Sequence, residues 1–183
     1  TLTEETLMSK AGTNAKVNPP LRTQRDIECL IQGLKDRVID AVATDHAPHT
    51  LADKECELSL AAFGISGFET AFGCLMSLVH KRRIDLPTLL FKLTCGPARV
   101  IRKNGKLGTL KVGVSANITI LDPERGWIVD NQKFASKGKN TPFNGCQFKG
   151  KVMASIVNGK LVYLDDFFTL SGKMRNLSQK KVS

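Results

Sequence analysis

The stretch AVATDHAPHT, Ala41 to Thr50, ends a run of strand-forming residues on a carboxylate and two imidazoles. The run itself, VIDAVAT at residues 38–44, is largely apolar, which is typical of a parallel strand that helices cover on both faces. Asp45, His46 and His49 follow within five positions. Because α/β proteins place functional side chains at the carboxyl ends of parallel strands, this pattern predicts a site at Asp45. A carboxylate buried at such a strand end needs a cation or several hydrogen-bond donors.

The residues before this strand predict a βαβ unit. A short strand is expected over AKVNPPLR, residues 15–22, and it must leave the sheet at the double proline, since proline donates no ladder hydrogen bond. A helix is expected over TQRDIECLIQGLKDR, residues 23–37, whose apolar residues fall on one helical face: Ile27, Leu30, Ile31 and Leu34. The second strand, VIDAVATDH at residues 38–46, completes the unit, which indicates an α/β fold.

Two more helices are expected after the loop that follows this strand. The first covers FETAFGCLMSLVHKR, residues 68–82, and its apolar face carries Phe68, Ala71, Phe72, Leu75, Met76 and Val79. The second covers residues 85–101, with Pro87 in its first turn. The pair Gly96-Pro97 is expected to end that helix or to start another short turn.

The character of the chain changes near Asn104, where glycine and β-branched residues become frequent. A strand is expected over residues 116–121, and Asn158-Gly159 predicts a β-hairpin with a type I′ turn. We therefore expect one domain over residues 1–103 and a small β part over residues 104–166. A basic tail over residues 167–183 follows.

Composition weighs against several classes of protein. The net charge is +10, but Lys and Arg are scattered without interleaved aromatic residues, so no nucleic-acid partner is expected. No apolar run approaches the roughly 18 residues of a membrane span, and the start TLTEETLMSK does not resemble a signal peptide. The five cysteines are widely spaced and form no CxxC pair, which favours free thiols in a reducing compartment. We expect a cytoplasmic protein without a membrane partner.

An isolated Asp-His pair more often caps a turn or lies on an ordinary surface than forms a site. Two other segments favour the site at Asp45. VNPPLR places Asn18 and Arg22 at the end of the preceding predicted strand, and AAFGISGFET, residues 61–70, holds glycines where the backbone can approach a ligand closely. Both segments would open onto the same face of the sheet as Asp45. His80, at the end of a predicted helix, is expected to be a surface residue.

Five segments together resemble the C-terminal half of type I dihydroorotases: KVNPPLR, ATDHAPHT, FGISGFET, SKGKNTPFNG and VNGKLV, in this order and spacing. Members of this family are metal-dependent cyclic amidohydrolases of pyrimidine synthesis. The resemblance covers about residues 2–162. ATDHAPH is its specific motif, because hydantoinases and allantoinases share the strand and its Asp but usually differ in the next residues. NPPLR alone is less specific.

The resemblance implies a (β/α)8 TIM barrel with a small β-sandwich. This chain would supply the seventh and eighth barrel strands, the last helices and part of the sandwich, since a whole barrel takes about 250 residues. The other metal ligands of the family precede this segment: an HxH pair, a bridging acidic residue or modified Lys, and two more histidines. The chain, which has no initiator Met, is expected to be a fragment that is inactive and poorly stable by itself.

The resemblance also implies roles for matching residues. Asp45 would bind a metal and act as the general acid and base. Asn18 and His49 would hold the substrate, the backbone of Phe63-Gly64 would complete the pocket, and Arg22 would bind substrate or pair with carboxylates. The implied cofactor is Zn²⁺, binuclear in the complete protein. The implied reaction is reversible hydrolysis of dihydroorotate to N-carbamoyl-L-aspartate.

Two alternatives stay open. One is a different cyclic amidohydrolase, such as an allantoinase or hydantoinase, although the residues APH after Asp45 weigh against it. The other is a non-catalytic dihydroorotase-like partner of aspartate carbamoyltransferase, although the joint presence of Asp45, Asn18 and His49 favours catalysis. The expected partners are the small-molecule substrate, aspartate carbamoyltransferase and further copies of the same chain.

Overall fold

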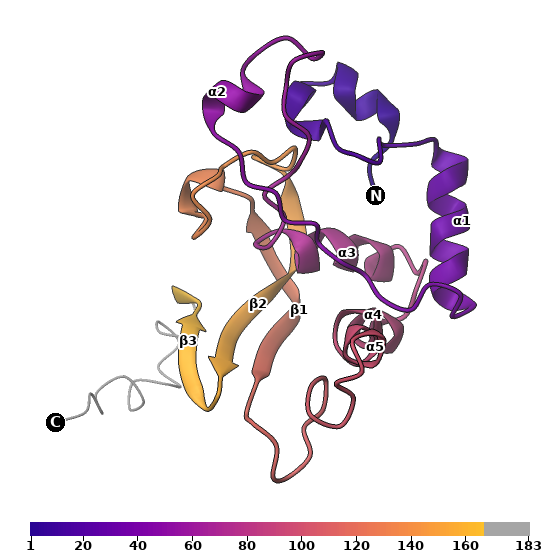
Figure 1. Cartoon of the computed structure of the whole chain (residues 1–183), viewed down its shortest axis with the longest axis vertical. Coiled ribbons are helices and arrows are strands. Elements are labelled where there is room, and N and C mark those ends of the chain that lie inside the picture. The colour runs from indigo at the N-terminus through magenta and orange to yellow at the C-terminus, as the bar shows by residue number, and fades with distance from the viewer. Residues whose placement is uncertain (167–183) are drawn as a thin grey trace, which may run out of the picture.

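The computed structural model of this 183-residue chain describes residues 1–166, so the predicted basic tail lies outside the described residues. Figure 1 shows helix α1, Gln24–Lys35, on one side of the molecule and the β-sheet on the other, with helix α3, Ala71–His80, between them. Short 3₁₀ turns occur at Glu4–Met8 (η1), Gly12–Ala15 (η2) and Asn131–Lys133 (η3). Within residues 1–166, no helix is long and apolar enough to cross a membrane.

Helix α1 is confirmed where the apolar spacing predicts it. A capping box begins the helix, because the Thr23 hydroxyl accepts a hydrogen bond from the Asp26 N–H while the Asp26 carboxylate accepts one from the Thr23 N–H. Ile31 is buried, as predicted, with 5% of its surface exposed. The assignment of Leu30 to the same core face is wrong, since Leu30 is 58% exposed and lines a pocket instead.

Helices α1, α3 and α4 (Leu86–Leu93) pack around the main apolar core, and α5 (Cys95–Val100) packs against α4. Its buried side chains come from α1, α3, α4 and the connection before α4: Ile31, Phe72, Met76, Leu78, Ile84 and Leu89. The pair Gly96-Pro97 lies in the first turn of α5, so the predicted option of another short turn is confirmed. Proline is tolerated there because a first-turn N–H has no partner inside the helix.

The sheet is antiparallel, in the order β1 (Ile118–Ile128), β2 (Gln147–Val157) and β3 (Lys160–Leu164). Strand β1 runs further than the strand predicted over residues 116–121. Asn158 and Gly159 join β2 to β3 with φ values of 49° and 77°, which belong to a type I′ turn. The predicted hairpin is therefore confirmed.

Helix α3 packs directly against β2, as seen near the centre of Figure 1. Two glycines permit this close approach. A Cβ atom on Gly150 would lie 2.6 Å from Cγ of Met76, and a Cβ atom on Gly73 would lie 3.0 Å from the ring of Phe148. This packing fixes the helical part of the chain to the sheet.

The strands predicted over residues 15–22 and 38–46 are absent among the described residues. Residues 38–45 form no ladder, and one isolated parallel bridge joins His46 to Ile65. The N–H of Val42 donates instead to the carbonyl oxygen of Lys92. A strand exists only where neighbouring backbone pairs with it, and residues 1–166 place no ladder partner beside either segment. The prediction of a βαβ unit with a parallel sheet is therefore wrong for the described residues.

Candidate active site

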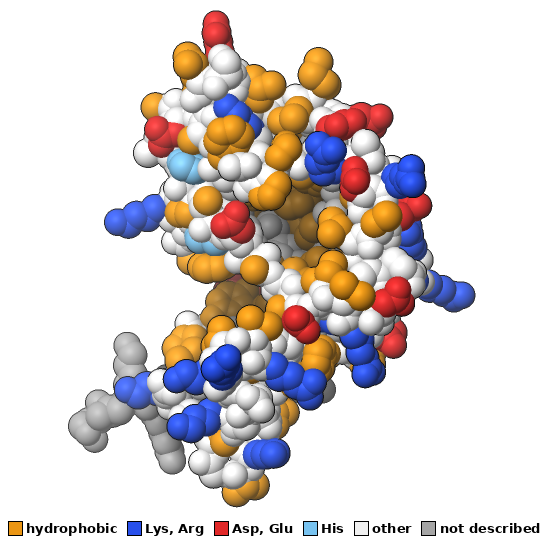
Figure 2. All heavy atoms as spheres, turned by 45° about the vertical axis from the view of Figure 1, so that its right-hand side comes forward, with side chains coloured by type: hydrophobic (Ala, Val, Ile, Leu, Met, Phe, Trp, Pro, Cys, Tyr) orange, Lys and Arg blue, Asp and Glu red, His pale blue; other side chains and the backbone are white. Residues whose placement is uncertain are grey.

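Three segments that are far apart in sequence meet around a pocket of about 620 Å³. Most of its wall comes from residues 17–22, 43–45 with 47, and 63–65, and the rest comes from α1 and from Thr1, Leu2 and Phe143. The face of the molecule in Figure 2 is hollowed, and hydrophobic side chains surround the hollow. Five of the six candidate residues lie on this wall: Asn18, Arg22, Asp45, Phe63 and Gly64.

Asp45 occupies the end of the segment at residues 38–45, with φ at 45°. Its side chain is exposed and forms no hydrogen bond or ion pair with any of residues 1–166. The prediction of a buried, partnered carboxylate is therefore wrong here, because no neighbouring strand covers the segment. Both carboxylate oxygens remain available to a ligand, a proton or a metal at the pocket wall.

Asn18 lines the same pocket as Asp45, and its bond to Pro19 is cis. Its side chain is exposed and has no hydrogen-bond partner in the described part of the chain. A free amide offers two N–H donors and a carbonyl acceptor. Asn18 can therefore bind a polar substrate group without first breaking an internal contact.

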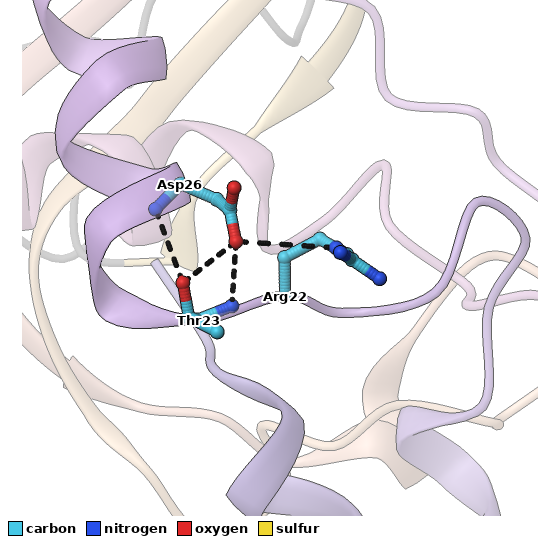
Figure 3. A network of polar contacts seen from close by, with 3 residues as sticks. All are labelled: Arg22, Thr23 and Asp26. Atoms are coloured by element: carbon cyan, nitrogen blue, oxygen red, sulfur yellow. Dashed lines mark hydrogen bonds and ion pairs between the residues drawn. The ribbon is translucent and has the colours of Figure 1, made fainter.

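Arg22 is engaged at the pocket rim with the first turn of α1 (Figure 3). Its Nε atom lies 3.9 Å from Oδ2 of Asp26, and the same carboxylate binds the backbone and hydroxyl of Thr23. The hydrogen bonds from Thr23 hold the pKa of Asp26 below its ordinary value, and the charge of Arg22 adds a smaller lowering. An exposed ion pair of this kind is worth little, so Arg22 can turn toward an anionic ligand at small cost.

The peptide Phe63-Gly64 also lines the pocket, and His49, which does not line it, holds this peptide by a hydrogen bond. The ring Nε2 of His49 lies 2.9 Å from the carbonyl oxygen of Phe63, and because a carbonyl only accepts, Nε2 carries the hydrogen. A Cβ atom on Gly64 would lie 2.5 Å from Cβ of Ala47, so only glycine fits. His49 itself is not among the residues that line the pocket.

His46 also links the segment at residues 43–47 to the residues that follow Gly64. Its Nδ1 accepts hydrogen bonds from the N–H groups of Gly67 and Phe68, at 3.1 and 3.3 Å, which leaves Nε2 to donate to the Ser136 hydroxyl at 3.3 Å. The Phe68 ring stacks on the imidazole at 3.9 Å. The placement of Phe68 on the core face of α3 is wrong, since Phe68 is 65% exposed and precedes the helix.

Asn140 is a site residue that the sequence patterns did not identify. It is 5% exposed, and its amide N–H groups donate to the carbonyl oxygens of Ala47 and Gly64 at 3.0 and 3.1 Å. Its side-chain oxygen accepts from the N–H of His49 at 2.8 Å and from the Ser66 hydroxyl at 2.9 Å. The only signal for it was its place in SKGKNTPFNG, because four simultaneous hydrogen bonds cannot be seen in a sequence.

The described residues supply only one of the ligands that the metal predicted from the resemblance needs. Among residues 1–166, no three side chains of His, Cys, Asp or Glu come close enough together to hold a metal ion. Asp45 alone fits, since its oxygens are free and carboxylate oxygen is a ligand for Zn²⁺. His80, the remaining histidine, is exposed and contacts the carbonyl oxygen of Pro123 at 3.1 Å, as expected of a surface residue.

A model of the Amidohydrolase family matches residues 1–162. The chain belongs to the amidohydrolase family. The dihydroorotase of Thermoanaerobacter sp. (strain X514) is 48% identical over 167 residues, which cover 91% of this chain and 38% of that protein. The dihydroorotase of Syntrophus aciditrophicus (strain SB) is 45% identical over 166 residues, with the same two shares. The predicted resemblance to dihydroorotases is confirmed, and the chain spans about 38% of the length of these relatives.

Solved structures of other amidohydrolases share the fold. The L-hydantoinase (dihydropyrimidinase) from Arthrobacter aurescens aligns with a TM-score of 0.83 at 30% identity, covering 89% of this chain and 37% of that enzyme. The dihydropyrimidinase from Brevibacillus agri NCHU1002 aligns with a TM-score of 0.80 at 22% identity, covering 89% and 37%. Residues 1–166 therefore have the arrangement of one part of these larger amidohydrolases.

Proposed function

We propose that this chain forms one wall of the active site of a dihydroorotase, which hydrolyses the cyclic amide of dihydroorotate reversibly to N-carbamoyl-L-aspartate in pyrimidine synthesis. The observation that carries the proposal is the pocket, which the unpaired residue Asp45 lines together with Asn18, Arg22 and the Phe63-Gly64 peptide. The names and identities of the curated relatives, all dihydroorotases at 44–48%, support the same reaction.

The proposal includes the placement of the chain in a (β/α)8 barrel. Residues 38–46 would be one of its last strands, and their missing ladder hydrogen bonds would go to strands that other residues supply. The division at residue 103, with a sandwich part over residues 104–166, belongs to the same proposal. It is supported by the order of the elements, since all five α-helices of the described residues precede the sheet.

The residues of the pocket have separate tasks in this reaction. Asp45 takes a proton from the attacking water and gives it to the ring nitrogen as the C–N bond breaks and a C–O bond forms, which is general base and acid catalysis by one carboxylate. Asn18 and Arg22 donate hydrogen bonds to the carboxylate of the substrate. His49 holds the Phe63 carbonyl, so its contribution to binding would pass through the orientation of that peptide.

Zn²⁺ is the proposed cofactor, with Asp45 as one of its ligands. A bound zinc ion lowers the pKa of a coordinated water and polarises a carbonyl group. One carboxylate does not hold a metal, so the proposal requires ligands from residues other than 1–166. A cytoplasmic location, a homo-oligomeric state and a partnership with aspartate carbamoyltransferase remain predictions.

A fusion protein provides the test. The full chain replaces the 167 residues that match it in the dihydroorotase of Thermoanaerobacter sp., and the rate of dihydroorotate hydrolysis is measured. We expect activity in the fusion and a loss of about 10²–10⁴-fold on Asp45→Asn, because general acid-base groups contribute that much. The exposed Asp45 makes no internal contact, so the variant should stay folded. The proposal fails if the folded fusion is inactive or if Asp45→Asn keeps most of the activity.

A panel of substrates distinguishes a dihydroorotase from the second candidate, a different cyclic amidohydrolase. The match to L-hydantoinase, at 30% identity, favours hydantoin as the alternative cyclic amide. Faster hydrolysis of hydantoin or allantoin than of dihydroorotate would replace the first proposal by this one. A fusion that folds, binds aspartate carbamoyltransferase and hydrolyses none of the three would support the non-catalytic partner.

A further inference from the structure

Lys54 is a buried cation beneath the pocket wall that the proposed chemistry does not use. It is the last residue of α2, Leu51–Lys54, a short helix that begins with a capping box between Thr50 and Asp53. Only 2% of its surface is exposed. No carboxylate in residues 1–166 forms an ion pair with its ammonium group.

Three backbone carbonyl oxygens surround the Lys54 ammonium instead. Nζ donates to the carbonyl oxygens of Ala62 at 2.7 Å and Gly64 at 3.1 Å, with a longer contact to that of Lys16 at 3.5 Å. An ammonium group has three N–H donors, so this set uses all of them. The N–H of Gly64 also donates to the carbonyl of Lys16 at 2.9 Å, which closes the connection between the two segments.

The two segments that Lys54 joins are both walls of the pocket. Lys16 precedes Val17 and Asn18, which line one wall, and Ala62 precedes Phe63 and Gly64, which line another. Lys54 lines neither wall. Its hydrogen bonds therefore link the backbone that precedes Asn18 to the backbone that forms the Phe63-Gly64 peptide.

Burying a cation without a counter-ion is costly, so a core position of this kind normally carries an apolar residue. Loss of hydration lowers the pKa of Lys54, and the charge of Lys16 lowers it further. An apolar side chain would avoid that cost but would leave the Ala62 carbonyl oxygen without a donor, while the Lys16 and Gly64 carbonyls would each keep one donor, from the Gly64 N–H and the Asn140 amide. The feature that lysine alone supplies is the simultaneous hold on three carbonyls.

We propose that Lys54 is a positioning residue of the active site, which sets the geometry of the substrate pocket by holding the backbones of Lys16 and Ala62–Gly64 together. This inference rests on the proposed function for its kinetic consequence. Substrate affinity should depend on Lys54, because the groups that it aligns bind substrate without taking part in proton transfer. The chemical step at Asp45 should depend on it much less.

Lys92 offers a matched control within the same chain. It is also 2% exposed, and its Nζ also donates to a backbone carbonyl, that of Ile39. Neither Lys92 nor Ile39 lines the pocket. Replacing either buried lysine by methionine removes the same charge and leaves carbonyl groups unpaired, so both variants are expected to lose stability.

The test compares Lys54→Met and Lys92→Met in the fusion protein by steady-state kinetics with dihydroorotate. We expect Lys54→Met to raise KM at least about tenfold and to change kcat by less than about threefold. A misplacement of binding groups by about 1 Å can lower catalytic efficiency by up to about 10²-fold. Lys92→Met should leave KM unchanged. Equal KM values in the two variants, or an effect of Lys54→Met on kcat alone, would overturn the positioning role.

Hydrogen exchange tests the role of Lys54 without relying on dihydroorotase activity. In the same fusion, Lys54→Met should accelerate exchange of the Gly64 amide, which donates to Lys16, and Lys92→Met should not. If the unmodified fusion is inactive, the dihydroorotase proposal fails, and the exchange at Gly64 alone decides on Lys54. Unchanged exchange at Gly64 in Lys54→Met would refute the inference.

Discussion

The pocket walls and the β-sheet differ in how their backbone groups are paired. Strand β2 pairs with β1 on one side and β3 on the other, so its polar groups are satisfied within a ladder. The segment at residues 38–46 has one bridge to Ile65, and its other contacts are single bonds from scattered positions, such as those from Val42 to Lys92 and from the Lys92 side chain to Ile39. Each strand of the sheet pairs with the next strand along the chain. The backbone of the pocket wall is instead bonded to residues from distant segments.

This difference explains why one region forms regular strands and the other does not. A hairpin needs only a suitable turn and two neighbouring strands. A parallel strand needs a crossover and neighbours far away in the chain. For residues 38–46, the hydrogen bonds that would define a strand have no partners within residues 1–166, although the apolar pattern of a strand is present.

Hydrogen exchange should give the largest contrast between the two regions. In the full chain, the amides of Ala43, Thr44 and Asp45 donate no hydrogen bond within residues 1–166, so their free energy of opening should be close to zero. Amides in the β2 ladder should open only with global unfolding. Exchange measured residue by residue checks this contrast.

The same measurement in the fusion protein sharpens the comparison. If residues 38–46 become a barrel strand there, these three amides should gain protection similar to that of β2. Protection already present in the full chain would contradict the observed lack of donors. If these three amides still exchange fast in an active fusion, residues 38–46 are not a barrel strand.

A pair of glycine substitutions should give the next largest effect. Gly64 has φ at 138°, and an added Cβ would lie 2.5 Å from Ala47, so Gly64→Ala should destabilise the chain by about 3 kcal/mol through strain and overlap. Gly159 has φ at 77° with nothing within 4 Å of an added Cβ, so Gly159→Ala should cost only about 1 kcal/mol. Urea denaturation followed by circular dichroism and by Trp127 fluorescence measures both values. Equal losses would show that the close packing at Gly64 contributes nothing.

The smallest expected effect concerns pH and the cap of α1. Hydrogen bonds from Thr23 lower the pKa of Asp26 from 3.8, so the folded state favours the ionised carboxylate. The resulting stability is fully present above pH 3.8 and is lost as the pH falls through the lower, folded-state pKa. Asp26→Asn should therefore be less stable than the unmodified chain at neutral pH, with a difference that shrinks on acidification.

Asp40→Asn is the matched control for this measurement, because Asp40 is exposed and its side chain has no hydrogen bond or ion pair among the described residues. Urea denaturation between pH 2.5 and 7 compares the three proteins. A pH-independent difference for Asp26→Asn would contradict the capping explanation.

Local patterns predicted a large part of this fold because their causes are local. The spacing of Ile31 and Leu34 and the Asn158-Gly159 turn both act within a few residues. Strand formation at residues 15–22 and the burial of Asp45 were predicted wrongly, because both depend on neighbours that a local pattern does not contain.

The sequence by itself indicated the family, helices α1, α3 and α4, the hairpin and five of the residues that line the pocket, since these follow from motif chemistry and from short-range periodicity. Only the tertiary structure decided that His49 holds Phe63 by a hydrogen bond, that Asn140 ties Ala47 to Gly64, and that Lys54 lies beneath both walls. These contacts join residues up to 93 positions apart. Hydrogen bonds over such separations depend on the folded path of the backbone, which no single segment specifies.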